Sequence, residues 1–172
     1  MKDVLFLIGI MGSGKTTIGR ELGYRLSMNV VDTDEMIEKI CQKPIKDIFQ
    51  TEGEAAFRDH EEKILKSLSW PNTIVTTGGG IIIREENRKF MRENGLVIYL
   101  HTDPEVILER TAMDTSRPLL AHDRENQVTT LLNERIDNYL DADYIVNTSF
   151  KSIDTVTDEI IGFLTRDTRF WA

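Results

Sequence analysis

The segment from Gly9 to Thr17 constrains the fold of this chain more than any other part of its sequence. It reads GIMGSGKTT and matches the pattern G-x-x-x-x-G-K-[ST] through Thr16. The apolar run Val4–Ile8 enters it and an amphipathic segment leaves it, which is the strand–loop–helix setting that the pattern requires. Glycines let backbone N–H groups turn inward as an anion nest, and the following helix adds its positive dipole end. The segment therefore predicts a phosphate-binding loop, in preference to a glycine-rich turn without chemistry.

Six consecutive residues of this loop are predicted to contact the phosphates of a nucleoside triphosphate. They are Gly12, Ser13, Gly14, Lys15, Thr16 and Thr17. Lys15 supplies a charge for the β- and γ-phosphates and is a candidate catalytic residue, and the Thr16 hydroxyl is suited to bind Mg²⁺.

Short β-branched runs alternate with amphipathic segments along the rest of the chain. The runs predict fully buried strands at Val4–Ile8, Asn29–Thr33, Thr73–Thr77, Gly95–Leu100 and Tyr144–Asn147. The other segments predict helices at Lys15–Ser27, Asp34–Cys41, Ile45–Leu68, Arg84–Glu93, Pro104–Thr111, Asn126–Leu140 and Ser152–Arg166. Alternation of this kind predicts an α/β fold with a parallel sheet and helices on both faces. A length of 172 residues suits one domain, residues 1–172.

Composition and charge exclude several classes of partner. The formal net charge is −8 and no run of Lys and Arg occurs, so we expect no nucleic-acid binding. An anion must then be held by a local cluster of positive groups. No run of about 18 apolar residues occurs, so we expect no membrane span. The single cysteine, Cys41, favours a cytoplasmic location, and we expect it to be inert because no neighbouring histidine supports a thiolate.

The class of nucleotide enzyme follows from motifs that the sequence lacks. No glycine has an aspartate three residues before it, and no N-K-x-D motif occurs, which excludes a regulatory GTPase. Motor and helicase ATPases are longer than this chain. A small-molecule kinase remains, and its acceptor site should lie at the carboxyl ends of the strands, beside the phosphate loop.

Two carboxylates and a glycine triplet are the candidate acceptor residues at that edge. Asp32 and Asp34 end the second expected strand, and their i, i+2 spacing predicts that they share one face. One could order Mg²⁺ through water and the other could accept a proton from a substrate hydroxyl, although capping of the next helix is an equal alternative for Asp34. Gly78, Gly79 and Gly80 end the third strand at the same edge of the sheet. At least one of them is expected to adopt a positive φ.

These motifs resemble the shikimate kinase family over nearly the whole chain. The matching pieces, which agree in order and spacing, are GIMGSGKTT, DTDEMIE, IFQTEGEAAFRDHE, TTGGG, RPLL and RIDNY followed by AD. The resemblance implies a three-layer phosphate-loop kinase fold with strand order 2-3-1-4-5. It also implies that ATP, with Mg²⁺, phosphorylates the 3-hydroxyl of shikimate, a step toward chorismate and the aromatic amino acids. We expect a monomer.

On the substrate side, the resemblance implies that Arg58 and Arg135 clamp the carboxylate of shikimate, within and beside a helical region of about residues 34–60. The planar fork of arginine suits a carboxylate. An ion pair of Arg58 with Glu61 or Glu62, three or four residues later, is the alternative from the residues alone.

The remaining roles concern the transferred phosphate. The resemblance implies that Asp32 holds Mg²⁺ through water and that Asp34 bonds the acceptor hydroxyl as base. Gly79 and Gly80 would lie against the substrate ring and hydroxyls, and a side chain at the glycine positions would occupy the space of the substrate. Arg110 would lie near the adenine.

The polar stretch over residues 112–124 predicts a mobile lid, with an ordinary exposed loop as the alternative. A lid would exclude water, and Arg117 would reach the transferring phosphate from it.

Two alternatives to shikimate phosphorylation stay open from the residues. One is a related kinase for gluconate or a nucleoside monophosphate. The other is a binding domain without activity, which the presence of Lys15, Thr16, Asp32, Asp34 and Arg117 disfavours.

Overall fold

A computed structural model of the chain describes residues 3–67, 71–112 and 124–171. Its strands form a five-stranded, all-parallel sheet in the order β2-β3-β1-β4-β5. They are β1 (Val4–Ile8), β2 (Asn29–Asp32), β3 (Thr73–Thr76), β4 (Leu96–His101) and β5 (Tyr144–Asn147). Phe6 of β1 lies opposite Val75 on one side and Val97 on the other, which places the strand before the phosphate loop at the centre. The predicted fold class and strand order are confirmed.

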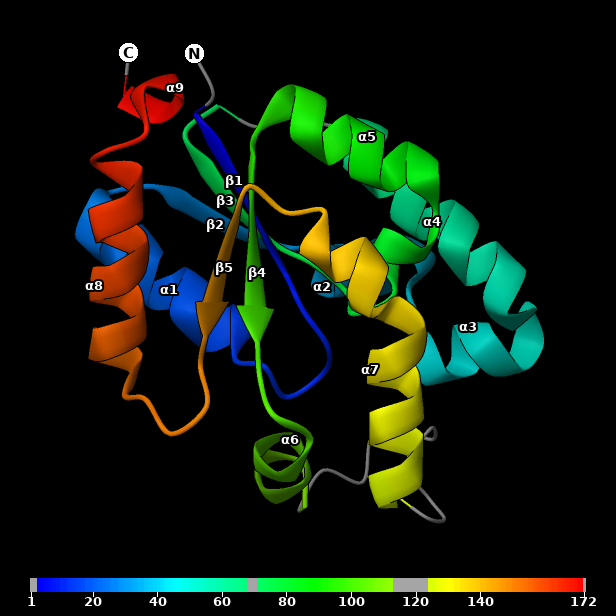
Figure 1. Cartoon of the computed structure of the whole chain (residues 1–172). Coiled ribbons are helices and arrows are strands. Elements are labelled where there is room, and N and C mark those ends of the chain that lie inside the picture. Colours follow the sequence, from blue (N-terminus) through cyan, green and yellow to red (C-terminus); the bar gives the residue numbers. More distant parts are fainter. Residues whose placement is uncertain (1–2, 68–70, 113–123, 172) are drawn as a thin grey trace.

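Helices cover both faces of the sheet and make a three-layer molecule (Figure 1). They are α1 (Lys15–Leu26), α2 (Thr33–Cys41), α3 (Ile45–Thr51), α4 (Gly53–Ser67), α5 (Glu85–Asn94), α6 (Pro104–Arg110), α7 (Arg124–Leu140), α8 (Ile153–Leu164), α9 (Thr168–Trp171) and the 3₁₀ helix η1 (Ile81–Ile83). Within the described residues, no helix has the length and apolar character needed to cross a bilayer.

The alternation of side chains along β1 divides the core into two layers. Successive residues of a strand point to opposite faces. Leu5 and Leu7 pack with apolar residues of α1 and α8, whereas Phe6 and Ile8 pack with residues of α5 and α7. All four side chains are buried, so the strand that leads into the phosphate loop is held from both sides.

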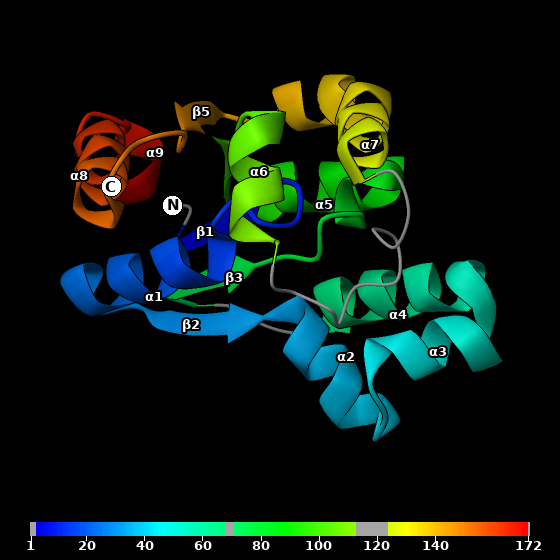
Figure 2. The same ribbon diagram turned by 90° about the horizontal axis from the view of Figure 1, so that it is seen from below.

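A third, smaller core holds α2, α3 and α4 together beyond the β2 edge of the sheet (Figure 2). The sequence predicts a single helix over Ile45–Leu68 here, and this prediction is wrong. The chain forms α3 and α4 instead, because Gly53 adopts a left-handed φ of 84°, which changes the direction of the chain between the two helices. The break lets α3 fold back against α4, where Phe49 and Phe57 pack with ring centroids 4.7 Å apart.

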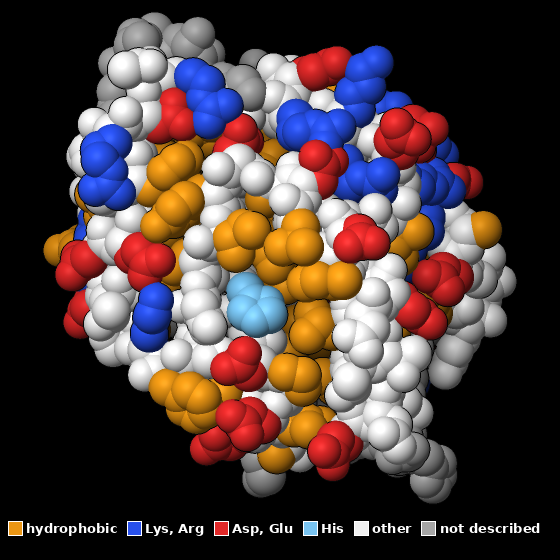
Figure 3. All heavy atoms as spheres, viewed as in Figure 1, with side chains coloured by type: hydrophobic (Ala, Val, Ile, Leu, Met, Phe, Trp, Pro, Cys, Tyr) orange, Lys and Arg blue, Asp and Glu red, His pale blue; other side chains and the backbone are white. Residues whose placement is uncertain are grey.

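The edge strands are less buried than their apolar sequences predict. Asn29 of β2 is exposed, and Ile145 of β5 is 43% exposed. Apolar side chains gather on the face over β4 and β5, between α8 and α7 (Figure 3). The prediction of full burial holds for β1 and β3 and fails for β2 and β5, because an edge strand has a neighbour on one side only.

Candidate active site

The phosphate loop joins β1 to α1 at the carboxyl edge of the sheet, the edge that faces the viewer in Figure 2. Gly12 and Gly14 adopt φ values of 77° and 92°, where other residues are strained. Gly14 is also the N-cap of α1, so no side chain at that position accepts from the first N–H groups of the helix. These donors and the helix dipole together form a site that favours an anion.

Lys15 folds back over the loop that precedes it. Its Nζ atom donates to the carbonyl oxygens of Gly9, at 2.8 Å, and Ile10, at 2.9 Å. Ser13, which is fully buried, donates its backbone N–H to Ile10 O at 3.2 Å. The ammonium group is therefore held at the mouth of the nest, where the outer phosphates of a nucleotide would lie.

Asp32 connects the phosphate loop to the next two elements. Its Oδ2 atom accepts from the Thr16 hydroxyl at 3.1 Å and from the Thr76 hydroxyl at 2.6 Å. Its Oδ1 atom accepts from the backbone N–H groups of Asp34, at 3.0 Å, and Glu35, at 3.3 Å. Thr16 and Asp32, both predicted at the metal, are thus in direct contact.

The prediction that Asp32 and Asp34 lie along one face of a strand is wrong. β2 ends at Asp32, and Asp34 lies in the first turn of α2. The capping role considered for Asp34 belongs to Asp32, since its carboxylate takes the first N–H groups of α2. Both carboxylates still lie at the carboxyl edge, because the helix starts where the strand stops.

The first glycine of the triplet, Gly78, lies too close to two carboxylates to carry a side chain. A methyl group on Gly78 would lie closer than 3.0 Å to both Asp34 Oδ1 and Glu61 Oε1. The expectation of a positive φ in the triplet is wrong: the glycines with positive φ in the described part of the chain are Gly9, Gly12, Gly14 and Gly53. Close approach, rather than backbone conformation, explains the glycine here.

The other two glycines meet different parts of the site. A methyl group on Gly79 would lie 3.4 Å from Gly9 O and from the Met11 backbone N, both in the phosphate loop. A methyl group on Gly80 would lie closer than 3.0 Å to the Cζ, Nη1 and Nη2 atoms of Arg58. The triplet therefore places main chain directly between the phosphate loop and an arginine head group.

Arg58 and Arg135 meet at one cavity of about 390 Å³. The cavity is formed by α3, α4, η1 and α7, and its lining residues are Phe49, Glu54, Arg58, Ile83, Leu131, Glu134, Arg135 and Asn138. Glu54 and Glu134 line the cavity as well, so its two arginines supply the directed donors for an anion and not an excess of positive charge.

Arg58 is held in place by two carboxylates of its own helix. Its Nη1 atom donates to Glu61 Oε2 at 2.6 Å, and its Nη2 atom donates to Glu54 Oε1 at 2.9 Å. The pair with Glu61 that the sequence offered as an alternative is therefore present, and it coexists with the place of Arg58 at the cavity. Sequence reasoning missed Glu54, although its spacing of four residues before Arg58 was a usable signal.

Glu61 is the most perturbed carboxyl group of the site. Its side chain is fully buried, and among the described residues its Oε1 atom has no hydrogen-bond partner. Burial, with a smaller contribution from Asp34, raises the pKa of Glu61 to about 7, against the opposing charges of Arg58 and Arg135. The carboxyl thus carries a proton in weakly acidic solution.

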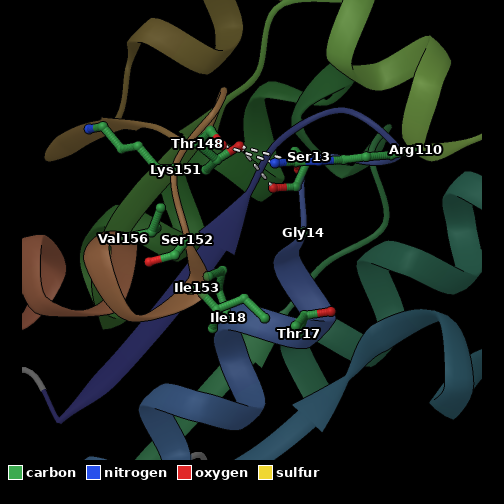
Figure 4. A pocket seen from close by; sticks show the side chains of 10 residues that line it. All are labelled: Ser13, Gly14, Thr17, Ile18, Arg110, Thr148, Lys151, Ser152, Ile153 and Val156. Atoms are coloured by element: carbon green, nitrogen blue, oxygen red, sulfur yellow. Dashed lines mark hydrogen bonds between the residues drawn. The ribbon is translucent and has the colours of Figure 1, made fainter.

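A second cavity, of about 220 Å³, lies beside the phosphate loop (Figure 4). Its lining residues are Ser13, Gly14, Thr17, Ile18, Arg110, Thr148, Lys151, Ser152, Ile153 and Val156. Arg110 donates to Thr148 O at 2.9 Å, and Figure 4 shows both side chains beside Ser13 at one end, with Ile18 and Ile153 at the other. A polar end and an apolar end suit a flat, partly polar group such as a nucleobase.

Cys41 has a histidine neighbour, contrary to the expectation from the sequence. Its Sγ atom lies 3.7 Å from His60 Nε2, which is also 3.4 Å from Glu52 Oε2. The two residues are far apart in sequence and meet because α2 packs against α4. Arg117 and most of the predicted lid over residues 112–124 lie outside the described residues.

A phosphate loop at the centre of a parallel 2-3-1-4-5 sheet, with an arginine-lined cavity beside it, defines a phosphate-loop kinase for a small anionic acceptor. Residues 11–165 match the sequence model of the family described as "Shikimate kinase". The chain belongs to the shikimate kinase family and is an enzyme of the phosphotransferase class.

Individual relatives agree with this placement. The chain is 48% identical over 160 residues to a shikimate kinase of Bacillus mycoides (strain KBAB4), covering 93% of this chain and 96% of the relative. A shikimate kinase from Acinetobacter baumannii, solved in complex with shikimate, superposes with a TM-score of 0.93 at 34% identity, over 98% of this chain and 96% of that one. A shikimate kinase from Aquifex aeolicus gives a TM-score of 0.80 at 36% identity, over 94% and 96% of the two chains.

Proposed function

We propose that this chain transfers the γ-phosphoryl group of ATP to the 3-hydroxyl of shikimate, giving shikimate 3-phosphate for aromatic amino-acid synthesis. The observation that carries the proposal is the meeting of Arg58 and Arg135 at one cavity, next to a glycine triplet that touches the phosphate loop. The bound shikimate named for the Acinetobacter baumannii relative supports the same substrate.

The substrate carboxylate is bound by the two arginines. Shikimate is a small ring with one carboxylate and three hydroxyl groups, and a guanidinium group can give a carboxylate two parallel charge-assisted hydrogen bonds. Glu54 and Glu61 hold Arg58, so its orientation is set before the substrate arrives. Gly79 and Gly80 leave the main chain open to the ring, within a substrate-binding region that includes residues 34–60.

The acceptor hydroxyl is bound by Asp34. Its backbone N–H is bonded to Asp32, which fixes the first turn of α2, and its carboxylate lies against Gly78. A carboxylate in this place orients the 3-hydroxyl toward the γ-phosphate and accepts its proton as the new P–O bond forms.

The phosphates of ATP lie in the nest formed by the loop residues from Gly12 to Thr17, with Lys15 on the β- and γ-phosphates. The donor set at the head of α1 suits Mg²⁺, because the Thr16 hydroxyl and the Asp32 carboxylate are adjacent hard oxygen groups. Thr16 would bind the ion directly and Asp32 through water. The bound ion neutralises charge on the phosphates.

The adenine lies at the second cavity, beside Arg110. We propose that Arg117, from a lid over residues 112–124, would reach the transferring phosphate. The single cysteine supports a cytoplasmic location, and we propose that the chain acts as a monomer within one domain, residues 1–172.

A coupled assay of ADP release, with shikimate, gluconate and AMP offered separately, tests the proposal. We expect turnover with shikimate alone, and ³¹P NMR should identify the product as a phosphate monoester of shikimate. Turnover with gluconate or AMP in its place would assign the cavity to another acceptor, and no turnover with any of them would leave a binding domain.

A further inference from the structure

Tyr139 lies on α7, one helical turn after Arg135, and its side chain is fully buried. Its hydroxyl donates to the carbonyl oxygen of Gly79 at 2.6 Å. Burial raises the pKa of Tyr139 to about 12, and the charge of Arg135, together with a hydrogen bond from its side chain, opposes that rise. The hydroxyl therefore bonds the glycine triplet and lies in the field of the Arg135 charge, four residues away on the same helix.

The ring of Tyr139 is fixed by stacking on Tyr99. The ring centroids are 4.8 Å apart and the planes differ by 5°. The hydroxyl of Tyr99 takes a different partner, His101 Nδ1, at 3.0 Å. The two tyrosines thus share the same packing, but only the Tyr139 hydroxyl reaches residues assigned to the substrate.

Gly79 extends this connection to the phosphate loop. Its Cα lies so close to the loop that an added methyl group would stand 3.4 Å from Gly9 O and the Met11 backbone N. The hydroxyl of Tyr139 consequently ties α7 to main chain that packs against the phosphate loop.

We propose that Tyr139 is a positioning residue for substrate binding: its hydroxyl sets the Arg135 guanidinium and the Gly79 carbonyl in one relative orientation. The inference rests on the proposed function, because it needs Arg135 to bind the carboxylate of shikimate. An arginine side chain loses several rotatable degrees of freedom when it binds a ligand, and a partner that holds it beforehand lowers that cost. A hydroxyl suits the task because it accepts from the cation while donating to the carbonyl.

Tyr139→Phe tests the proposal, with Tyr99→Phe as the matched control. Each change removes one hydroxyl from the same stacked pair. We expect Tyr139→Phe to raise the KM for shikimate by roughly five- to twentyfold, with the KM for ATP changed by less than about twofold. Tyr99→Phe should leave both constants within about twofold of the wild type. In an Arg135→Ala background, Tyr139→Phe should have little further effect on shikimate, since the two changes act on one interaction.

Three outcomes would overturn the inference while leaving the proposed function intact. They are a wild-type shikimate KM in Tyr139→Phe, equal rises for shikimate and ATP, and equal effects of the two tyrosine variants. Failure of the wild type to release ADP with shikimate is a different result, which would remove the proposed function and this inference together. Circular dichroism and thermal unfolding of both variants show whether each remains folded.

Discussion

Gly80→Ala is expected to weaken substrate binding through a single methyl group. The φ of Gly80 is −101°, which any residue can adopt, so the change introduces no backbone strain. The methyl group would instead overlap the Arg58 guanidinium, closer than 3.0 Å to three of its atoms. The head of a long side chain can move away, so we expect the protein to fold with Arg58 displaced from its place at the cavity.

The size of the effect follows from the bonds that Arg58 would make. A hydrogen bond to a charged group contributes about 1.5–3 kcal/mol, and about 1.4 kcal/mol corresponds to a factor of ten in affinity. Loss of one such bond to the substrate carboxylate therefore predicts about 10- to 150-fold weaker shikimate binding. Strain on the buried pair of Arg58 with Glu61 should also lower the free energy of unfolding by about 1–3 kcal/mol.

Calorimetric titration with shikimate and with a non-hydrolysable ATP analogue separates the two sites. Gly162→Ala is the control, because among the described residues the nearest atom to its methyl group, outside the α8 backbone, would be Arg166 Nη1 at 3.8 Å. We expect that variant to bind both ligands normally and to be as stable as the wild type or slightly more so. Normal shikimate affinity in Gly80→Ala, alongside a large loss in Arg58→Ala, would refute the steric reasoning.

Three further predictions address the arginine clamp, the phosphate loop and the buried carboxyl. Arg58→Ala should weaken shikimate binding by more than about tenfold with little change for ATP, and equal loss of both would contradict its assigned role. Lys15→Ala should abolish turnover while circular dichroism stays unchanged; surviving turnover would contradict the phosphate-loop assignment. Folding raises the pKa of Glu61 from 4.5 to about 7, so between these pH values the folded protein binds one proton more than the unfolded chain. The stabilisation that this proton gives is complete below pH 4.5 and is lost as the pH rises through 7. In the wild type, this group should lower the free energy of unfolding by up to about 3 kcal/mol between pH 4.5 and 8. The side chain of Glu61→Gln cannot ionise, so the variant should not show this fall. An unchanged pH dependence in the variant would contradict this account.

Local patterns were sufficient for the fold class and for most elements. The β-branched runs predicted β1 and β5 with their observed bounds, and the glycines before Lys15 predicted the start of α1. Such signals depend only on residues that are close in the chain, so they can be recognised from the sequence alone. The break at Gly53 was missed because the amphipathic period continues across it, and only the left-handed φ reveals two helices.

The sequence by itself determined the phosphate loop, the parallel sheet and, by resemblance, the family. Only the tertiary structure decided which groups meet: Gly80 with Arg58, Gly78 with Glu61, and Tyr139 with Gly79. It also decided that Asp34 belongs to a helix and that each glycine of the triplet lies against a different group of atoms. Periodicity states which face a residue occupies, but it carries no information on the distance between two faces, and that distance is set by the packing of whole helices against the sheet.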